Sequence, residues 1–230
     1  MTDHSTKQFF RAEPQSRTAF PVARAGWPII AAAAFVTFVL ALCELTVLAL
    51  IGILATLFIC NFFRDPDRVT PDKKGAVISP ADGRVVFTGV VDTNPFTGQP
   101  ALKIGIFMNI FNVHVNRIPF SGKIKKISYY PGKFYSADKE KASTDNEHNA
   151  VVIETENHGD IGVVQIAGLI ARRIICYAGE RDDVVSGQRF GIICFGSRVD
   201  VYLPPETTLE AGKGDKVKAG LSILGVLPSL

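Results

Sequence analysis

The sequence has few of the residues that build disulfide scaffolds or metal sites. Its four cysteines, Cys43, Cys60, Cys176 and Cys194, form no C-x-x-C pair, and each lies in an apolar run. Its four histidines are scattered along the chain. We therefore expect small buried thiols in a reducing compartment, and neither disulfides nor a bound metal ion.

The chain also lacks a strong charge of either sign. Its formal net charge is +3 over 230 residues, and it has no basic stripe interleaved with aromatic residues. This balance argues against a nucleic-acid partner and suits weak attraction to an anionic membrane surface. A cleavable signal peptide is not expected, because the apolar region begins late and no small-residue cleavage site cleanly follows it.

Residues 27–63 form one long apolar run, with Glu44 as its only charge. A single helix over this run would be about 55 Å long, whereas a bilayer core is about 30 Å thick. The run therefore predicts two helices, Pro28–Leu42 and Thr46–Phe63, arranged as a transmembrane helical hairpin. A shallow re-entrant hairpin and a buried helix pair in a soluble core are the alternatives.

The flanks of the apolar run predict its placement. Trp27, Phe62 and Phe63 suit an interfacial aromatic belt, and the charges of Arg64–Arg68 predict a surface segment. Basic residues on both sides put both ends in the cytoplasm, where those after the run could meet lipid phosphates. These residues are Arg17, Arg24, Arg64, Arg68, Lys73 and Lys74. The chain thus divides into a flexible tail (1–26), a membrane hairpin (27–63) and a further domain (64–230).

The sequence pattern of residues 64–230 predicts a mainly β, or β-rich α+β, fold. Short runs rich in Val, Ile and Phe alternate with turn residues. Residues 208–220 have turns similar to those of biotinyl and lipoyl barrel-sandwich domains, without the carrier lysine hairpin. Residues 166–175 allow one helical turn. The predicted strands are 76–78, 83–91, 101–108, 122–130, 150–156, 161–166, 174–176, 191–195, 199–203 and 216–223.

One serine lies in an unusual place, directly after Gly196 and between two apolar strands. Gly196 has no Cβ, so its carbonyl is open to approach, and the Ser197 hydroxyl is the group best placed to attack it. A plain β-bulge or turn is the alternative.

Two further residues could supply acid–base chemistry. Asp82 lies in the tight turn Ser79–Gly83, and His114 lies among apolar residues beside Asn112, Asn116 and Arg117. With Ser197 they could form a nucleophile, base and orienting group. A serine hydrolase would use the same three residues, although no G-x-S-x-G elbow is present. A turn aspartate bonded to its own backbone and a hydrogen-bonded core histidine are the alternatives.

Five short motifs follow one another along the chain with fitting spacing. They are Phe62–Pro66, Ser79–Gly83, Asn112–Arg117 with Pro119, Gln165–Gly168 with Ala171–Arg173, and Phe195–Ser197. Together they resemble phosphatidylserine decarboxylases of the short, membrane-anchored bacterial and archaeal type.

The resemblance implies a barrel-sandwich-hybrid-like decarboxylase domain that cleaves itself. Ser197 would attack the Gly196 carbonyl to give an ester, and elimination and hydrolysis would leave chains 1–196 and 197–230 as a heterodimer, with a higher oligomer left open. The small chain would begin with a pyruvoyl group made from Ser197. Its Schiff base with phosphatidylserine would act as the electron sink for loss of CO₂, leaving phosphatidylethanolamine.

The resemblance also implies roles for the other residues. Asp82 would help self-cleavage, and His114 would be the acid/base near the pyruvoyl group. Longer relatives carry a second histidine where this chain has Arg117, so either His114 serves both steps or Arg117 acts electrostatically on the oxyanion or the substrate carboxylate. Arg117, Asn116 and Asn112 are the candidates for substrate binding.

The implied setting is the inner membrane, with the catalytic domain facing the cytoplasm. Two functions compete with the decarboxylase: a membrane-tethered serine hydrolase and a non-catalytic barrel-sandwich adaptor.

Overall fold

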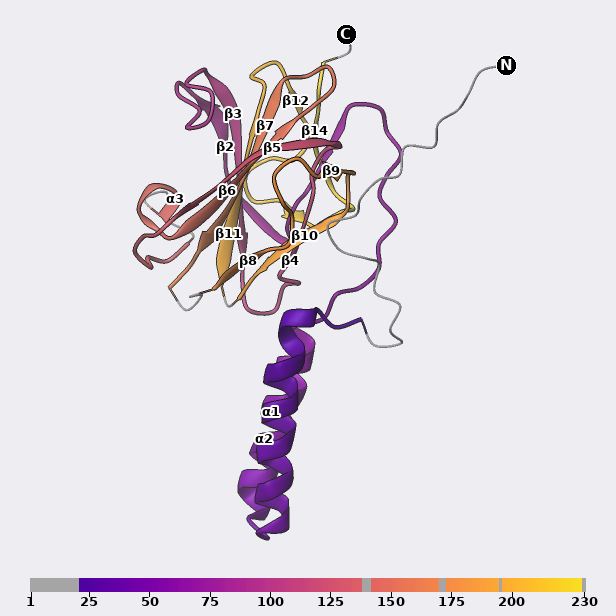
Figure 1. The fold of residues 1–230 in the computed structure, drawn as a ribbon, viewed down its shortest axis with the longest axis vertical. Helices are drawn as coiled ribbons and strands as arrows, with labels where there is room; N and C mark the ends of the chain where they lie inside the picture. The colour runs from indigo at the N-terminus through magenta and orange to yellow at the C-terminus, as the bar shows by residue number, and fades with distance from the viewer. Residues whose placement is uncertain (1–20, 138–141, 170–172, 195, 229–230) are drawn as a thin grey trace, which may run out of the picture.

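A computed structural model describes residues 21–137, 142–169, 173–194 and 196–228. Two long helices project from one end of a β-rich body (Figure 1). The helical elements are η1 (Arg24–Gly26), α1 (Trp27–Leu42), α2 (Thr46–Phe62) and α3 (Ala142–Asp145). The strands are β1 (Ala76–Ile78), β2 (Gly83–Val91), β3 (Ala101–Met108), β4 (Val115–Arg117), β5 (Gly122–Tyr130), β6 (His148–Glu154), β7 (Asp160–Ala167), β8 (Ile174–Cys176), β9 (Asp183–Val184), β10 (Arg189–Ile193), β11 (Ser197–Leu203), β12 (Thr208–Leu209), β13 (Lys216–Val217) and β14 (Ile223–Val226).

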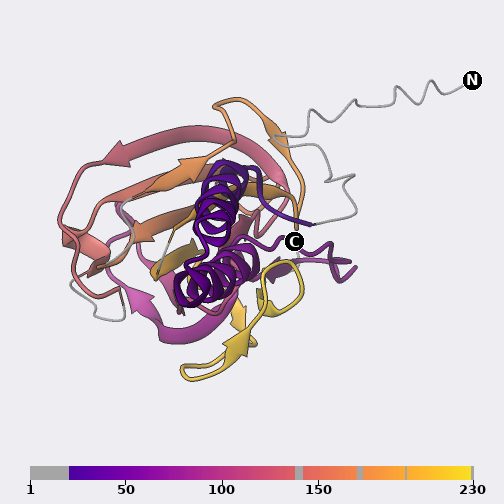
Figure 2. The ribbon, with the colours of Figure 1, turned by 90° about the horizontal axis from the view of Figure 1, so that it is seen from below.

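Helices α1 and α2 lie side by side along their length (Figures 1 and 2). Gly52 lets the helices approach closely, since a Cβ there would meet Thr37, and the Thr37 and Thr56 hydroxyl oxygens are 3.3 Å apart. Most of the other apolar side chains of the pair are exposed. By length and composition, the helical stretch Arg24–Leu42 could cross a membrane, whereas Thr46–Phe62 is shorter. The predicted helix bounds are confirmed to within one residue.

The main sheet has eight strands in the order β13-β2-β3-β11-β7-β6-β5-β9, and every neighbouring pair is antiparallel. It curls around a core of branched apolar side chains, such as Ile106, Val163 and Val201 (Figure 2). Strand β11 lies in the middle, paired with β3 and β7, and all seven of its residues are buried. The start of β11 is therefore one of the most enclosed places in the fold.

Two small sheets complete the body. They have the orders β1-β14-β12 and β4-β10-β8. The second sheet packs next to the helix pair, where Phe62 and Phe63 join an apolar cluster with Val115 of β4 and Ile192 of β10. The helices are thus packed into the body rather than connected to it only by the chain.

Of the predicted strands, about half have their exact bounds, and strands 150–156, 161–166, 191–195 and 199–203 have bounds one or two residues off. Five predicted strands have the bounds that the structure gives them, namely 76–78, 83–91, 101–108, 122–130 and 174–176. The strand predicted over 216–223 is wrong, because a turn with Gly220 at φ +72° separates β13 from β14. Strands β4, β9 and β12 and helix α3, of two to four residues each, were missed because they contain polar residues, whereas the equally short β1 and β8 are wholly apolar runs. The helical turn proposed for 166–175 falls partly on residues outside the described ranges.

Three other expectations need correction. Residues 1–20 of the expected flexible tail lie outside the described residues, but Ala23 of its last part donates its N–H to the Phe63 carbonyl at 2.8 Å. Phe62 and Phe63 are fully buried and so do not form an interfacial belt. All four cysteines are free, but Cys43 is exposed at the turn between the two helices.

The segment predicted to be a charged surface is so only in part: Asp67 is exposed, but Asp65 is buried and the Arg68 side chain is largely covered, because both pair with the β-rich body. Asp65 pairs with Arg189 at 2.6 Å and with Arg117 at 3.5 Å, and Arg68 pairs with Asp82 through both carboxylate oxygens. We call these five residues and Asp67, which pairs with Arg189 at 2.7 Å, the ionic clasp. Arg68 is thus not available to lipid phosphates.

Replacing Asp65 with asparagine should destabilise the fold strongly. The change leaves Arg117 with no carboxylate partner and Arg189 with only the exposed Asp67, so we expect a loss of about 3–5 kcal/mol in the free energy of unfolding. Denaturant unfolding followed by circular dichroism measures it. Asp67→Asn is the matched control and should cost under about 1 kcal/mol, because the Asp67 side chain is 72% exposed. Equal losses of unfolding free energy in the two variants would contradict a special stabilising role for the buried Asp65 ion pairs.

Candidate active site

The Gly196–Ser197 bond lies where β11 begins. Ser197 is fully buried, and its hydroxyl has no hydrogen-bond partner among the residues that the structure describes. A buried hydroxyl without a partner costs about 1–3 kcal/mol, so folded proteins rarely keep one without a use for it. The preceding Phe195 lies outside the described residues.

Gly196 has a left-handed backbone, with φ at +64°, which favours glycine. A Cβ at this position would meet no atom within 4 Å, so conformation and not space requires glycine here. The crowding falls instead on Gly168, where a Cβ would clash with the Gly196 carbonyl oxygen. The approach of the Ser197 hydroxyl to this carbonyl stays a prediction; the close neighbour that the structure shows is Gly168, which makes room for the carbonyl oxygen.

His114 is also fully buried, and its ring is held in one orientation. The Nδ1 atom lies 2.9 Å from the Asn112 carbonyl oxygen. Because a carbonyl oxygen only accepts hydrogen bonds, Nδ1 carries the proton and Nε2 keeps a lone pair. Nε2 is buried and has no hydrogen-bond partner in the described part of the chain.

The environment of His114 keeps its imidazole neutral. Burial, helped by the positive charge of Arg64, lowers the pKa of His114 to about 4 against the opposing effects of the Asn112 carbonyl and the Asp82 carboxylate. At neutral pH the ring is therefore uncharged, and Nε2 can accept a proton.

Two connections bring His114 and Ser197 to the same end of the domain. Ser197 pairs with Met108, the last residue of β3, and the loop that leaves Met108 leads to His114. The His114 carbonyl accepts a hydrogen bond at 3.4 Å from the N–H of Ile193, which ends β10 four residues before Ser197. This end of the domain is the one that packs against the helix pair.

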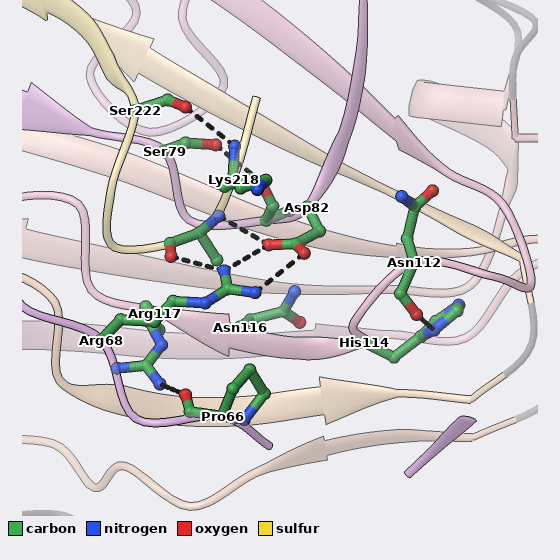
Figure 3. A network of polar contacts seen from close by, with 12 residues as sticks. Pro66, Arg68, Ser79, Asp82, Asn112, His114, Asn116, Arg117, Lys218 and Ser222 are labelled. Carbon is green, nitrogen blue, oxygen red and sulfur yellow. Dashed lines mark hydrogen bonds and ion pairs between the residues drawn. The ribbon is translucent and has the colours of Figure 1, made fainter. Parts of the chain in front are cut away.

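The structure does not join Asp82 to His114. Both Asp82 oxygens pair with Arg68, and one also accepts the Ala219 N–H at 2.7 Å. Figure 3 shows Asp82 in this network, with His114 set apart and bonded to Asn112. The predicted nucleophile, base and orienting group therefore form no hydrogen-bonded relay among the described residues. The Asn112 carbonyl orients the imidazole, and Asp82 acts on it only through its charge.

The predicted substrate-binding residues serve other contacts. The Arg117 guanidinium donates to the carbonyls of Pro66 and Gly187, both at 2.9 Å, and pairs with Asp65. Burial lowers the pKa of Arg117 to about 10, so it stays charged at neutral pH. The Arg117 guanidinium is therefore held inside the ionic clasp by these contacts.

The two asparagines contact residues that neighbour Ser197 and His114. Asn116 accepts a hydrogen bond from Gln165 at 2.8 Å and points its amide nitrogen at the Met108 sulfur, 3.8 Å away. Asn112 is partly exposed, and its side chain accepts the N–H of Asn109, which shapes the turn before His114. Both asparagines thus support the residues around Ser197 and His114.

A pocket of about 450 Å³ lies elsewhere, between α3 and the main sheet. Lys103, His148 and Tyr202 are among its lining residues, and none of the predicted site residues lines it. Ser197 therefore does not open into this pocket.

Sequence reasoning missed Phe62 and Arg68 as neighbours of the site. The Phe62 ring lies 4.2 Å from the His114 ring, centroid to centroid, and Arg68 holds Asp82. The sequence did contain one signal for Arg68, the alternation of charges directly after an apolar helix. Such an alternation is compatible with a set of buried ion pairs as well as with a solvent-exposed segment.

Comparisons with known proteins identify the family. The family model described as phosphatidylserine decarboxylase matches residues 55–225. A phosphatidylserine decarboxylase proenzyme of Desulfotalea psychrophila is 53% identical over 205 residues, covering 89% of this chain and 96% of the relative. Proteins of the same name from Geotalea uraniireducens and Syntrophus aciditrophicus are each 48% identical, covering 90% and 89% of this chain and 97% and 96% of the relatives.

The matches to the relatives cover about nine tenths of the chain, whereas the family model covers the end of α2 and the β-rich body, including the Gly196–Ser197 bond, His114 and Asp82. The chain belongs to the phosphatidylserine decarboxylase family.

Proposed function

We propose that this enzyme matures by cleaving its own Gly196–Ser197 bond and then converts phosphatidylserine to phosphatidylethanolamine and CO₂. One observation carries the proposal: the buried Ser197 hydroxyl and Nε2 of the buried, neutral His114 imidazole both lack a hydrogen-bond partner among the described residues, and both lie at the same end of the domain. The name proenzyme, which the relatives bear, fits a chain that requires processing.

The proposed cleavage begins when His114 Nε2 takes the hydroxyl proton of Ser197. The Ser197 oxygen attacks the Gly196 carbonyl carbon, the peptide C–N bond breaks, and Gly196 becomes an ester of the serine oxygen while the serine nitrogen regains a proton. A base then removes the Ser197 α-proton, and elimination releases the Gly196 carboxylate and leaves a dehydroalanine. Its enamine tautomerises to an imine, and water hydrolyses the imine to the pyruvoyl carbonyl and ammonia.

Asp82 assists this step through its charge. Transfer of the serine proton makes His114 an imidazolium, which a nearby carboxylate stabilises. Because Asp82 contacts Arg68 and not the imidazole, we infer that it acts at a distance. Arg117 is committed to the ionic clasp, so we favour His114 as the base for cleavage and as the acid/base of decarboxylation.

The residues present suit a pyruvoyl group at position 197. That position is held between Met108 and Ala167 on the flanking strands and lies near neutral His114. A pyruvoyl carbonyl supplies an electron sink for decarboxylation of a substrate amine. Because Ser197 is fully buried in the uncleaved chain, scission must also open a path for the lipid headgroup.

We further propose that the helix pair is a transmembrane or re-entrant hairpin of the inner membrane, and that residues 64–230 are a barrel-sandwich-hybrid-like decarboxylase domain on the cytoplasmic side. The exposed apolar surface of the helices supports this placement. The substrate lies in the bilayer, and the site is at the helix end of the domain. The cleaved chains would stay together, because β11 remains paired with β3 and β7.

The purified protein should contain a fragment of 34 residues, 197 to 230 inclusive, with a blocked amino end. A denaturing gel and the intact mass detect it. Ser197→Ala should stay full-length and lack decarboxylase activity, because both the nucleophile and the source of the pyruvoyl group are lost.

The other outcomes favour the competing functions. A single full-length species that decarboxylated phosphatidylserine would refute self-cleavage. A full-length species that hydrolysed lipid esters would indicate the membrane-tethered serine hydrolase, and one without lipid turnover would indicate the non-catalytic adaptor.

Gly168→Ala should slow maturation by about tenfold or more, since the added methyl group would push the Gly196 carbonyl away from its position. A pulse–chase measurement of the full-length chain follows this rate. Gly89→Ala is the matched control, because a Cβ there would make ordinary contacts with Phe87, and its maturation should be unchanged. A normal rate for Gly168→Ala would show that the carbonyl position is not critical.

Asp82→Asn should slow cleavage by about tenfold, and more than it slows decarboxylation in a sample that is already processed. The reason is that the carboxylate charge favours the imidazolium form of His114. Arg68→Gln breaks the same ion pair but keeps the carboxylate, so it should slow cleavage less at comparable stability. Equal slowing by the two variants would assign Asp82 a purely structural role.

A further inference from the structure

Phe62 ends helix α2 directly against the imidazole of His114. Its side chain is fully buried, and the two ring centroids are 4.2 Å apart with an interplanar angle of 34°. The contact joins residues 52 positions apart and connects the apolar helix pair to the candidate active site.

The imidazole is therefore restrained in two directions. The Asn112 carbonyl holds Nδ1 within the plane of the ring, and Phe62 covers one face of it. Asn112 is itself held, because its N–H donates to the Asn109 carbonyl and its side chain accepts the Asn109 N–H. With these two restraints, the direction in which Nε2 points is set by the surrounding structure.

We propose that Phe62 is a positioning residue for His114, fixing the plane of the imidazole and excluding water from one face. This inference rests on the proposed role of His114 as the base for cleavage. It gives the helix pair a second task besides membrane attachment, because the last residue of α2 becomes part of the support of the base.

The electrostatics of His114 are consistent with such a cover. Arg64 lowers the pKa of His114 and Asp82 raises it, but burial is the largest influence. Cys194, in the same apolar cluster as Phe62, has a thiol pKa raised by burial and is uncharged at neutral pH. An aromatic face attracts a cation and would by itself raise the pKa of His114, whereas exclusion of water by the Phe62 ring lowers it.

Phe63 provides a matched control. It is equally buried, belongs to the same apolar cluster and lies next to Phe62 in the chain. Its side chain packs closely on Gly26, and no ring contact with His114 is found among the described residues. Truncation of either phenylalanine to leucine removes a similar amount of core packing, but only one of the two changes uncovers the imidazole.

The direct test is an NMR titration of His114 in the full chain carrying Ser197→Ala, with the signal assigned through His114→Gln. We expect a pKa near 4 in this parent and in its Phe63→Leu variant. Phe62→Leu and the more volume-conserving Phe62→Met should raise the pKa by about one unit or more, towards 6.5. Values unchanged in both Phe62 variants would overturn the inference.

The second test is the pH dependence of maturation in chains with Ser197 intact, synthesised cell-free and shifted to defined pH. A general base must be unprotonated, so a higher pKa moves the acidic limb of the rate profile to higher pH. Phe62→Leu should show this shift of about one pH unit, together with a slower plateau, and Phe63→Leu should not.

The His114→Gln chain distinguishes failure of the proposed role of His114 from failure of the proposed role of Phe62. If it matures at the rate of the unaltered chain, His114 is not the base and the proposed function fails at that residue. If it does not mature, but Phe62→Leu and Phe63→Leu have the same pH profile, then the base is correct and the positioning role of Phe62 is wrong.

Discussion

The structure depends on the set of buried ion pairs that joins the segment after the helices to the β-rich body. Asp65 lies between Arg117 and Arg189, and Arg68 closes on Asp82. Removing one partner of a buried pair is costly, because the remaining charge stays desolvated. The segment therefore has one preferred position, and that position places Phe62 and Phe63 against the end of the domain that carries His114.

Around the scission point, the protein keeps polar groups in a state that folding alone would disfavour. The Ser197 hydroxyl and His114 Nε2 are buried without hydrogen-bond partners among the described residues, and Gly196 has a left-handed backbone. Unpaired buried polar groups and left-handed backbone cost free energy of folding, and they persist only where the surrounding structure fixes the local conformation. Here β3 and β7 hold β11 from both sides, so the Gly196–Ser197 bond lies at the end of a strand that is paired on both edges.

The sequence predicted regular elements where local pattern is strong. An apolar run too long for one helix gave both α1 and α2, and alternating β-branched runs gave the long strands. Of the short strands, the apolar β1 and β8 were predicted, and β4, β9 and β12 were missed because each includes polar residues. The order of the motifs identified Ser197, His114 and Asp82 as candidate residues, but it did not predict which side chains they contact. Asp82 meets Arg68 and not His114, and Arg117 meets Asp65 and not the scission point.

The sequence by itself determined the helix pair, the mainly β character of the body and the family, because these depend on local periodicity and on motifs read in order along the chain. The tertiary structure alone decided which charges pair, which glycine makes room for the Gly196 carbonyl and which side chain covers the imidazole. Those contacts join residues up to 137 positions apart. They exist only once the sheet has curled and the helices have packed against it, and no local pattern specifies them.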